Sequence, residues 1–581
     1  MPSFPLFPQP ETERGYPTRI ESIGDGIVYT NGANVYFSES RSLFSLHARK
    51  VTAVSVSPNG SLVASGDDQG TIRIFMSSPP HAQRFEYRVL AGGVRSLSWS
   101  ADGKQIAVGG EGGRGAGGAA CVLVETGGRV GEVTGHQKPV TAVAYRPKSP
   151  LRIVTGGEDG NLIFHEGTPF RFLRAHPGAV GGIVHAVRWE AGGGRVFAAG
   201  GDGGVVYFHG DTGDRLGGFG GGGGGAIWDF TILPNAILTG EKSLRLWEEV
   251  GSEFKLASEI STGKDFHAMV VGLTKGFAIT LDGSILKLSN EPVRITETIT
   301  GHQGTINSVI VSNGLLFSAT DGTIGQIFHD QFPQIISRSG KRNFSASQTL
   351  FALKDSAVYL TNDEKFIALD GSRSVASDPV SFACSWEGGV LVCSNKVSKI
   401  SFIPETLSPA LPLLKDVSVT AVCAHGIFYA IAREVGTGFS LAPKFEIEIY
   451  KKEADVVCLW KTIESPHQHA ISALALNSSY LVSGDCGGRV AVYENFSLMP
   501  ISNHWTFHKA KVVCIKFRAS DILTASLDRQ VCRWSVSEGL IGRIRDAHRD
   551  GVVTMVEYKE GIVTSGSDKI LRYWDMKDFV D

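Results

Sequence analysis

Two stretches near the C-terminus decide the fold: HKAKVVCIKFRASDILTASLDRQVCRWS, which begins at His508, and HRDGVVTMVEYKEGIVTSGSDKILRYWD, which begins at His548. In both stretches the histidine is followed by Thr after 16 residues, by Asp after a further 4 and by Trp after a further 6. Two identical spacings over four residue types indicate an internal repeat of about 40 residues.

Each repeat predicts a small antiparallel meander of short strands. An alternating run such as VVCIKF is followed by a turn, a short run that contains the Thr, a polar turn with the Asp, and a run that contains the Trp. Alternation with a period of two is typical of strands, and the polar turns separate them. The high glycine content, 71 residues spread along the chain, fits a fold with many tight turns.

The four repeated residues resemble the structural set of the WD-repeat blade. The Trp indole only donates, the Asp carboxylate only accepts, and Thr and His can do both, so the four predict a buried hydrogen-bonded chain without an orphan group. We interpret both sets as structural: His508, Thr524, Asp528 and Trp534, and His548, Thr564, Asp568 and Trp574.

The same pattern of short strands and polar turns recurs along the whole chain, with some of the marker residues missing, and gives fourteen units. Units with a histidine begin at His47, His136, His176 and His302, whereas others, such as ISALALNSSYLVSGDCGGRVAVYE, are expected to lack it. The boundaries are weakest at 343–369, 380–403 and 417–450. Fourteen units predict an all-β protein with two tandem seven-bladed WD-repeat β-propellers.

The chain ends predict how the rings close. The last unit stops after its third strand, and an open sheet edge is poorly tolerated. The N-terminal segment 1–16 contains a spare strand, residues 2–7 (PSFPLF), which we expect to complete the last blade. Residues 17–299 are then the first propeller and residues 300–581 the second.

Composition and motifs exclude several classes of function. The net charge of −2 does not suit a nucleic-acid binder, and no apolar run of 18 residues predicts a membrane span. Gly110-x-Gly112-x-x-Gly115 matches a dinucleotide fingerprint but lies between strands, without the helix that receives a pyrophosphate. We therefore expect a cytoplasmic, monomeric binding protein, not an enzyme, without cofactor or metal; the eight cysteines, which show no metal-ligand spacing, are expected to be buried reduced thiols.

One region resembles the actin-interacting protein one family, the WD-repeat partner of cofilin. That family has, in this order, a G-E-G loop, an S-R-P-x-R strand entry, a G-S-D-D turn and an E-G-P-P-F-K-F loop. The corresponding elements here are Gly110-Glu111-Gly112, Ser149-Pro150-Leu151-Arg152, Gly156-Gly157-Glu158-Asp159 and Glu166-Gly167-Thr168-Pro169-Phe170-Arg171-Phe172. The similarity is fairly continuous over residues 1–250 and extends to the rest through the architecture.

By this resemblance, the actin- and cofilin-directed surface maps onto Glu158, Arg171 and Phe172. An exposed aromatic beside a cation suits a protein interface, and the alternative is that Phe170 and Phe172 pack within an outer strand. Two positions depart from the family pattern. The charged residue after G-E-G-R has no acidic counterpart near Arg114, and His176 is not followed by the usual aromatic.

The resemblance implies an actin-filament regulator associated with the actin cytoskeleton. It would bind actin filaments together with ADF/cofilin and promote the disassembly of cofilin-decorated filaments by preferring one filament state. The alternative hypothesis is a generic WD-repeat interaction scaffold unrelated to actin, for example in ribosome assembly or ubiquitin-ligase recruitment.

Overall fold

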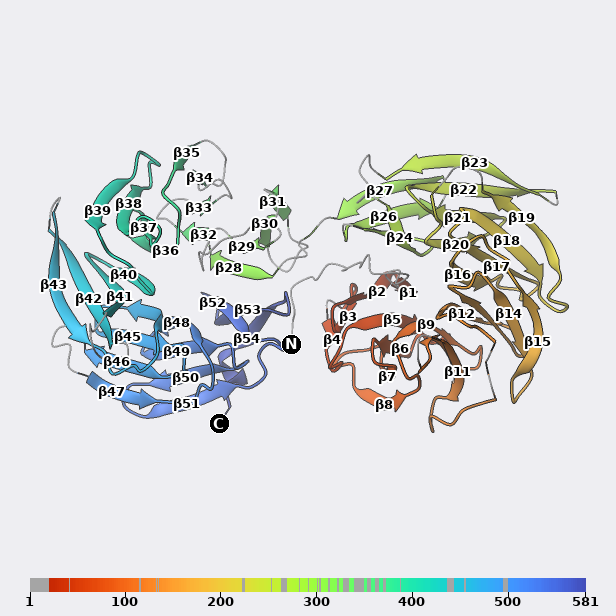
Figure 1. The fold of residues 1–581 in the computed structure, drawn as a ribbon, viewed down its shortest axis with the longest axis horizontal. Coiled ribbons are helices and arrows are strands. Elements are labelled where there is room, and N and C mark those ends of the chain that lie inside the picture. Colours follow the sequence, from red (N-terminus) through yellow and green to blue (C-terminus); the bar gives the residue numbers. More distant parts are fainter. Residues whose placement is uncertain are drawn as a thin grey trace. The chain divides into compact units, whose positions relative to one another are not determined.

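The structure is a computed structural model that describes residues 20–580 with short gaps. The gaps are residues 41, 114–115, 132, 134, 222–224, 252, 263–268, 282, 291, 300, 302–304, 312–313, 321–322, 328–333, 339–349, 353–356, 361–364, 369–372, 387, 436–443, 454–455 and 495–499. The chain divides between residues 300 and 301 into two compact units (Figure 1). Each unit is described by itself below.

The described residues form fourteen antiparallel sheets, which we number as blades 1 to 14 in chain order. Blades 1 to 7 belong to the first unit. Their strands are β1 (Ile20–Ile23), β2 (Gly26–Asn31), β3 (Asn34–Phe37) and β4 (Ser42–Phe44); β5 (Val51–Val56), β6 (Leu62–Asp67), β7 (Thr71–Met76) and β8 (Gln83–Arg88); β9 (Val94–Trp99), β10 (Gln105–Glu111) and β11 (Gly117–Leu123); β12 (Val140–Tyr145), β13 (Arg152–Gly157), β14 (Leu162–Glu166) and β15 (Arg171–His176); β16 (Val184–Trp189), β17 (Arg195–Gly200), β18 (Gly204–His209) and β19 (Arg215–Gly220); β20 (Asp229–Leu233), β21 (Ala236–Gly240), β22 (Ser243–Val250) and β23 (Glu253–Ser261); β24 (Val270–Leu273), β25 (Phe277–Thr280), β26 (Ile285–Asn290) and β27 (Val293–Ile299).

Blades 8 to 14 belong to the second unit. Their strands are β28 (Ile306–Val311), β29 (Leu315–Ala319), β30 (Thr323–Ile327) and β31 (Gln334–Arg338); β32 (Leu350–Ala352), β33 (Ala357–Leu360), β34 (Lys365–Ala368) and β35 (Ser374–Ala376); β36 (Phe382–Trp386), β37 (Gly389–Ser394), β38 (Lys399–Pro404) and β39 (Leu411–Lys415); β40 (Ala421–His425), β41 (Phe428–Val435), β42 (Lys444–Glu453) and β43 (Val456–Glu464); β44 (Ile471–Leu476), β45 (Tyr480–Asp485), β46 (Val490–Glu494) and β47 (Pro500–Trp505); β48 (Val512–Arg518), β49 (Asp521–Ser526), β50 (Val531–Ser535) and β51 (Gly539–Ile544); β52 (Val552–Tyr558), β53 (Gly561–Gly566) and β54 (Leu571–Asp575). A short 3-10 helix, η3 (Met576–Asp578), follows β54.

The first strands of successive blades lie side by side around the middle of each unit (Figure 1). In the first unit they enclose one cavity of about 620 Å³, which is lined by residues of all seven blades. In the second unit β28 of blade 8 contacts β52 of blade 14, and the Ser565 hydroxyl donates to the Ile306 carbonyl at 2.8 Å. The prediction of two tandem seven-bladed WD-repeat propellers is therefore confirmed.

Blade 14 has three strands among the described residues, in the order β52-β53-β54. The strand predicted to complete it, residues 2–7, lies outside the described residues, so closure by the N-terminus stays a prediction. At the other end of the chain, Val580 forms a bridge to Arg543 of β51, with Arg543 N donating to the Val580 carbonyl at 2.8 Å.

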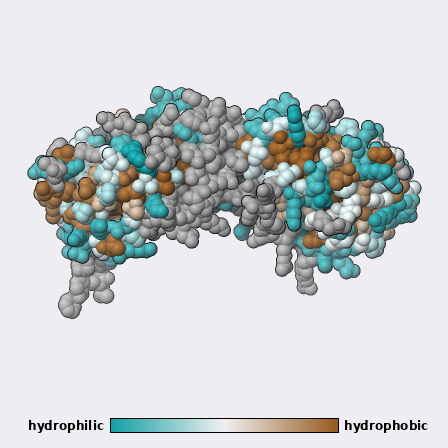
Figure 2. All heavy atoms as spheres, turned by 90° about the horizontal axis from the view of Figure 1, so that it is seen from above, coloured by the Kyte–Doolittle hydropathy of each residue, from teal (hydrophilic) through white to brown (hydrophobic). Residues whose placement is uncertain are grey.

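The hydrophobic core of each unit lies between neighbouring blades, because both faces of an inner strand are covered. Several of the exposed apolar side chains lie on outer strands. They include Phe172, Leu216 and Leu256 in the first unit and Leu411, Val456 and Leu459 in the second. On the face drawn in Figure 2, apolar residues lie among hydrophilic ones.

The eight cysteines are free thiols, but they are not uniformly buried. Cys458 and Cys486 are exposed, so the expectation of buried thiols is wrong for these two. Cys458 lies on β43, the last strand of blade 11, and Cys486 lies in the turn after β45. No helix within the described ranges is long and apolar enough to cross a membrane.

Candidate protein-binding surface

The predicted histidine networks lie inside blades 13 and 14. In blade 14, His548 Nδ1 lies 2.8 Å from Asp568 Oδ1, and its Nε2 lies 2.7 Å from Thr564 Oγ1. The Trp574 indole N–H donates to the same Thr564 oxygen at 2.8 Å. Blade 13 repeats the arrangement with His508, Thr524, Asp528 and Trp534, at 2.8 to 3.3 Å.

In this hydrogen-bonded series of four side chains, the donor-only Trp and the acceptor-only Asp determine which atom carries each proton. Because the Asp568 carboxylate can only accept, the neutral imidazole of His548 carries its proton on Nδ1 and donates it to Asp568. Nε2 is then an acceptor, so the Thr564 hydroxyl donates to it while its oxygen accepts from Trp574. Burial lowers the pKa of His548, which keeps the ring neutral at pH 7. The network is satisfied throughout and buried, so it stabilises the blade and leaves no group for chemistry.

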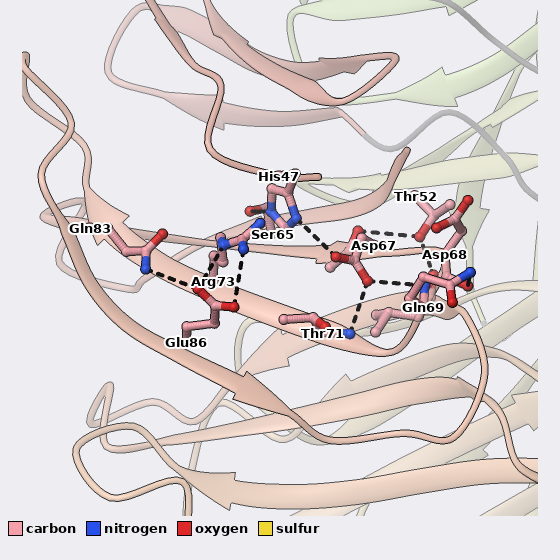
Figure 3. A network of polar contacts seen from close by, with 12 residues as sticks. His47, Thr52, Ser65, Asp67, Asp68, Gln69, Thr71, Arg73, Gln83 and Glu86 are labelled. Atoms are coloured by element: carbon pink, nitrogen blue, oxygen red, sulfur yellow. Dashed lines mark hydrogen bonds and ion pairs between the residues drawn. The ribbon is translucent and has the colours of Figure 1, made fainter. Parts of the chain in front are cut away.

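Blade 2 contains a related network around His47 (Figure 3). His47 Nε2 lies 2.6 Å from Ser65 Oγ, and Nδ1 lies 3.3 Å from Asp67 Oδ2. The other oxygen of Asp67 accepts from the backbone N–H groups of Gln69 and Thr71 at 3.0 and 2.9 Å. The carboxylate thus ties the β6–β7 turn to the loop before β5.

Blade 12 corrects one expectation from the sequence. This unit was expected to lack the histidine, but His467 lies 2.8 Å from Ser483 Oγ and 2.9 Å from Asp485 Oδ2. The spacing from histidine to Asp is 18 residues here, compared with 20 in blades 13 and 14, and Tyr493 lies where those two blades have Trp. Both changes obscured the repeat. His302, the predicted first residue of another unit, lies outside the described residues.

The loop Glu166–Phe172 is anchored in blade 4 by Phe170. Phe170 is 2% exposed and packs edge-on against Tyr145 at 5.8 Å between ring centroids. Its backbone also bridges to Gly131, which has φ +75° and leaves no room for a side chain, since a Cβ there would lie 2.3 Å from the Phe170 nitrogen. Glu166 pairs with Arg152 at 2.9 Å. The loop is therefore held on both sides.

Arg171 and Phe172 begin the outer strand β15, and both are exposed. Phe172 is 62% exposed, and its one described ring contact is an edge-on approach to His165 at 6.4 Å. Arg171 is also exposed. The alternative that both Phe170 and Phe172 pack within the strand thus holds for Phe170 alone.

Glu158 lies in the turn between β13 and β14 and contacts the neighbouring blade 3. Its carboxylate accepts from Arg95 of β9, which also pairs with Glu111 at 2.8 Å. The next residue, Asp159, turns inward and lies 3.0 Å from His136 Nδ1. Arg95 was not identified from the sequence, and Glu111 was identified only as part of the G-E-G element, because no motif links the start of one blade to the turn of the next.

The structure does not bring the three predicted site residues together. Arg171 lies opposite Glu166, which lies opposite Arg152, the first residue of β13. Glu158 follows the other end of the same strand. A strand rises about 3.3 Å per residue, so the length of β13 separates Glu158 from the Arg171–Phe172 pair by roughly 16 Å or more. The candidate surface therefore has two parts at opposite ends of blade 4.

The two departures from the family pattern are placed differently. Arg114 lies outside the described residues. His176 ends β15, and its Nε2 lies 2.7 Å from the Gly213 carbonyl of blade 5, so it connects two blades without joining a Thr–Asp network. The glycine fingerprint lies where Gly110 and Gly112 lead from β10 into the turn before β11, strand to strand.

The central cavity of the first unit has polar side chains in its wall. It carries an ion pair between Arg188 and Asp229 at 3.0 Å, and Asp229 also accepts from the Leu273 N–H at 3.0 Å. Within the described part of the chain, no group of three or more His, Cys, Asp or Glu is arranged to hold a metal ion.

Comparison with known proteins agrees with this architecture. The model of the WD domain, G-beta repeat, matches residues 38–75 and 127–166. The chain is 27% identical to actin-interacting protein 1 of Caenorhabditis elegans and 26% identical to the 66 kDa stress protein of Physarum polycephalum, over 98% of each chain in both comparisons. It is 31% identical to WD repeat-containing protein 1 of Xenopus tropicalis over 52% of each chain. The chain is thus a WD-repeat protein homologous, along nearly its whole length, to proteins named actin-interacting protein 1.

Proposed function

We propose that this protein binds actin filaments together with ADF/cofilin and promotes the disassembly of cofilin-decorated filaments, without chemistry of its own. The names of its relatives from Caenorhabditis elegans and Drosophila melanogaster, both actin-interacting protein 1, support the actin part of the proposal. The cofilin part rests on the resemblance of the Glu158 turn and the Glu166–Phe172 loop to the family motifs.

The observation that carries the proposal is the contrast within that loop. Phe170 is buried and anchors the backbone, whereas Arg171 and Phe172, the next two residues, are exposed. Aromatic and arginine side chains contribute most of the energy of protein interfaces when a partner covers them. Because the backbone is already held, little conformational entropy is lost on binding.

The mechanism would be differential binding. A platform that contacts actin and cofilin together, and prefers the strained or severed state of the filament, shifts the filament equilibrium by that preference alone. Two separated parts of the surface suit such a role, because Glu158 and Phe172 can contact different regions of a composite filament at the same time.

Co-sedimentation of the full chain with actin filaments, with and without cofilin, tests the proposal. We expect the chain to pellet with cofilin-decorated filaments, and the amount of unpolymerised actin to rise. A chain that stays in the supernatant under both conditions would overturn the actin proposal and favour a WD-repeat scaffold for other partners.

A further inference from the structure

Arg95 holds Glu158 in place from the neighbouring blade. It lies at the start of β9 in blade 3, and its side chain is 5% exposed. One terminal nitrogen, Nη2, lies 2.8 Å from Glu111 Oε1 at the end of β10, and the other, Nη1, donates to Glu158 Oε1 in blade 4. One buried guanidinium therefore joins two carboxylates of different blades.

We infer that Arg95 is a positioning residue for partner binding: its guanidinium fixes the Glu158 carboxylate at the edge of blades 3 and 4, where a cationic side chain of the partner can reach it. This inference rests on the proposed function, because that proposal makes Glu158 part of the binding surface. It adds a residue that does not itself face the partner.

The geometry of the turn supports a positioning role. The Glu158 backbone N–H donates to the Pro139 carbonyl at 2.9 Å, and Asp159 is held by His136 at 3.0 Å, so the backbone is fixed on both sides. Only the side chain of Glu158 can then still change its conformation, and the contact with Arg95 restricts it. A guanidinium is planar and offers a donor to each carboxylate, which a lysine ammonium of the same charge cannot do in the same geometry.

The charge balance agrees with a cationic partner group. The charges of Arg95, Glu111 and Glu158 themselves sum to one negative charge. Glu158 and Glu111 keep 22% and 33% of their side chains exposed, so both remain accessible while Arg95 is covered. A partner lysine or arginine would meet a carboxylate that is already oriented.

The chain offers a matched control in Arg195. This arginine also joins two glutamates of neighbouring blades: Nη2 lies 3.0 Å from Glu190 Oε1 and Nη1 lies 2.6 Å from Glu249 Oε1. The cluster connects blades 5 and 6 and contains none of the predicted binding residues. Its loss should report on blade packing alone.

The test compares cofilin-dependent binding to actin filaments for the full chain and for Arg95→Met, Glu158→Gln, the double variant and Arg195→Met. We expect Arg95→Met and Glu158→Gln each to weaken binding about ten-fold, the effect of one lost interface contact of ordinary strength. The double variant should bind no more weakly than either single variant, since Arg95 acts through Glu158. Arg195→Met should bind like the parent.

Each outcome decides the inference. Parent-like binding by a folded Arg95→Met variant, or losses that multiply in the double variant, would show that Arg95 does not act through Glu158. An equal loss of filament binding in Arg195→Met would show that the weaker binding of Arg95→Met comes from disturbed blade packing. If Arg95→Met does not fold, Arg95→Lys keeps the buried charge and takes its place in the comparison. Failure of the parent chain to bind would overturn the proposed function itself, and the role of Arg95 with it.

Discussion

Phe170 and Phe172 lie two residues apart on one loop and have opposite environments. Phe170 is 2% exposed against Tyr145 and the backbone of Gly131, and Phe172 is 62% exposed at the start of β15. The loop thus separates a residue that stabilises blade 4 from one that is free to meet a partner.

This separation predicts opposite effects of two substitutions. Phe170→Ala should cost about 3 to 5 kcal/mol of stability, because it removes a buried aromatic ring. Replacing Arg171 and Phe172 together by Ala should leave the melting temperature nearly unchanged and weaken cofilin-dependent disassembly by about 2 kcal/mol, roughly thirty-fold. Thermal melting and a disassembly assay measure the two effects.

The control for the Arg171 and Phe172 variant is a comparison of its loss of disassembly activity with its loss of folded protein. If activity in the Arg171 and Phe172 variant falls only as far as its folded fraction falls, Phe172 belongs to the fold. A variant that is both fully stable and fully active would remove Arg171 and Phe172 from the binding surface.

The distance between the two parts of the surface makes a second prediction. Glu158 and Phe172 lie at opposite ends of blade 4 and share no contact, and substitutions that far apart are usually additive within about 0.5 kcal/mol. Glu158→Gln combined with Phe172→Ala should therefore weaken filament binding by the product of the single effects. Strong non-additivity in binding titrations would mean that both residues reach one partner group through a rearrangement of the blade.

The architecture could be predicted from the sequence because the repeated residues have fixed hydrogen-bonding roles. A Trp that only donates and an Asp that only accepts, at constant spacing from His548, allow one arrangement, and the structure has these groups within hydrogen-bond distance. The histidine of blade 12 was missed because the spacing from His467 to Asp485 is shorter and Tyr493 takes the place of the Trp. A long-range contact such as the one between Arg95 and Glu158 spans 63 residues and leaves no local periodic signal.

The buried histidines predict that the fold weakens in mild acid. Burial is the largest influence on His47 and His548 and lowers the pKa of both below the ordinary value of about 6.5. Below that pH the unfolded chain takes up protons that the folded chain resists, so stability is complete at pH 7 and falls as the pH drops. The loss approaches about 1.4 kcal/mol per histidine for each pH unit over which only the unfolded state is protonated.

Urea unfolding between pH 7.5 and 5 measures this slope. The carboxyls of Asp67 and Asp568 should add nothing in that window. Burial, the largest single influence, raises their pKa, but the histidine partners together with backbone N–H donors outweigh it and the net pKa is lowered, so their contribution is lost only at stronger acid. His548→Gln should lower overall stability and flatten the slope. An unfolding midpoint that is constant over the window would mean that the histidines titrate freely in the fold.

Blade 14 has three strands among the described residues, and this leads to a prediction about the N-terminus. If residues 2–7 supply the missing strand beside β54, a chain that lacks residues 1–9 should expose an unpaired sheet edge and lose stability or aggregate. The first unit should stay folded. Light scattering and thermal melting test this, and a truncated chain that is monomeric and melts like the parent would exclude the N-terminal strand from blade 14.

Asp568 provides the test of the histidine network itself. Its carboxylate accepts from His548 Nδ1 at 2.8 Å and from the backbone N–H of Arg549 at 3.2 Å, and it lies 3.5 Å from Arg572. Asp568→Ala removes the final acceptor of the chain and leaves the His548 ring, buried and neutral, with an unsatisfied N–H. This should cost on the order of 1 to 3 kcal/mol of stability.

The same substitution should leave partner binding by the folded protein unchanged, because the network lies inside blade 14 and the proposed binding residues lie in blade 4. Asp568→Asn is the matched control. Its side-chain oxygen can still accept from His548 Nδ1, so it should retain more stability than the alanine variant and lose mainly the charge that faces Arg572. Equal melting of the alanine variant and the parent would show that water replaces the carboxylate, and the tetrad would then not contribute to the stability of the blade.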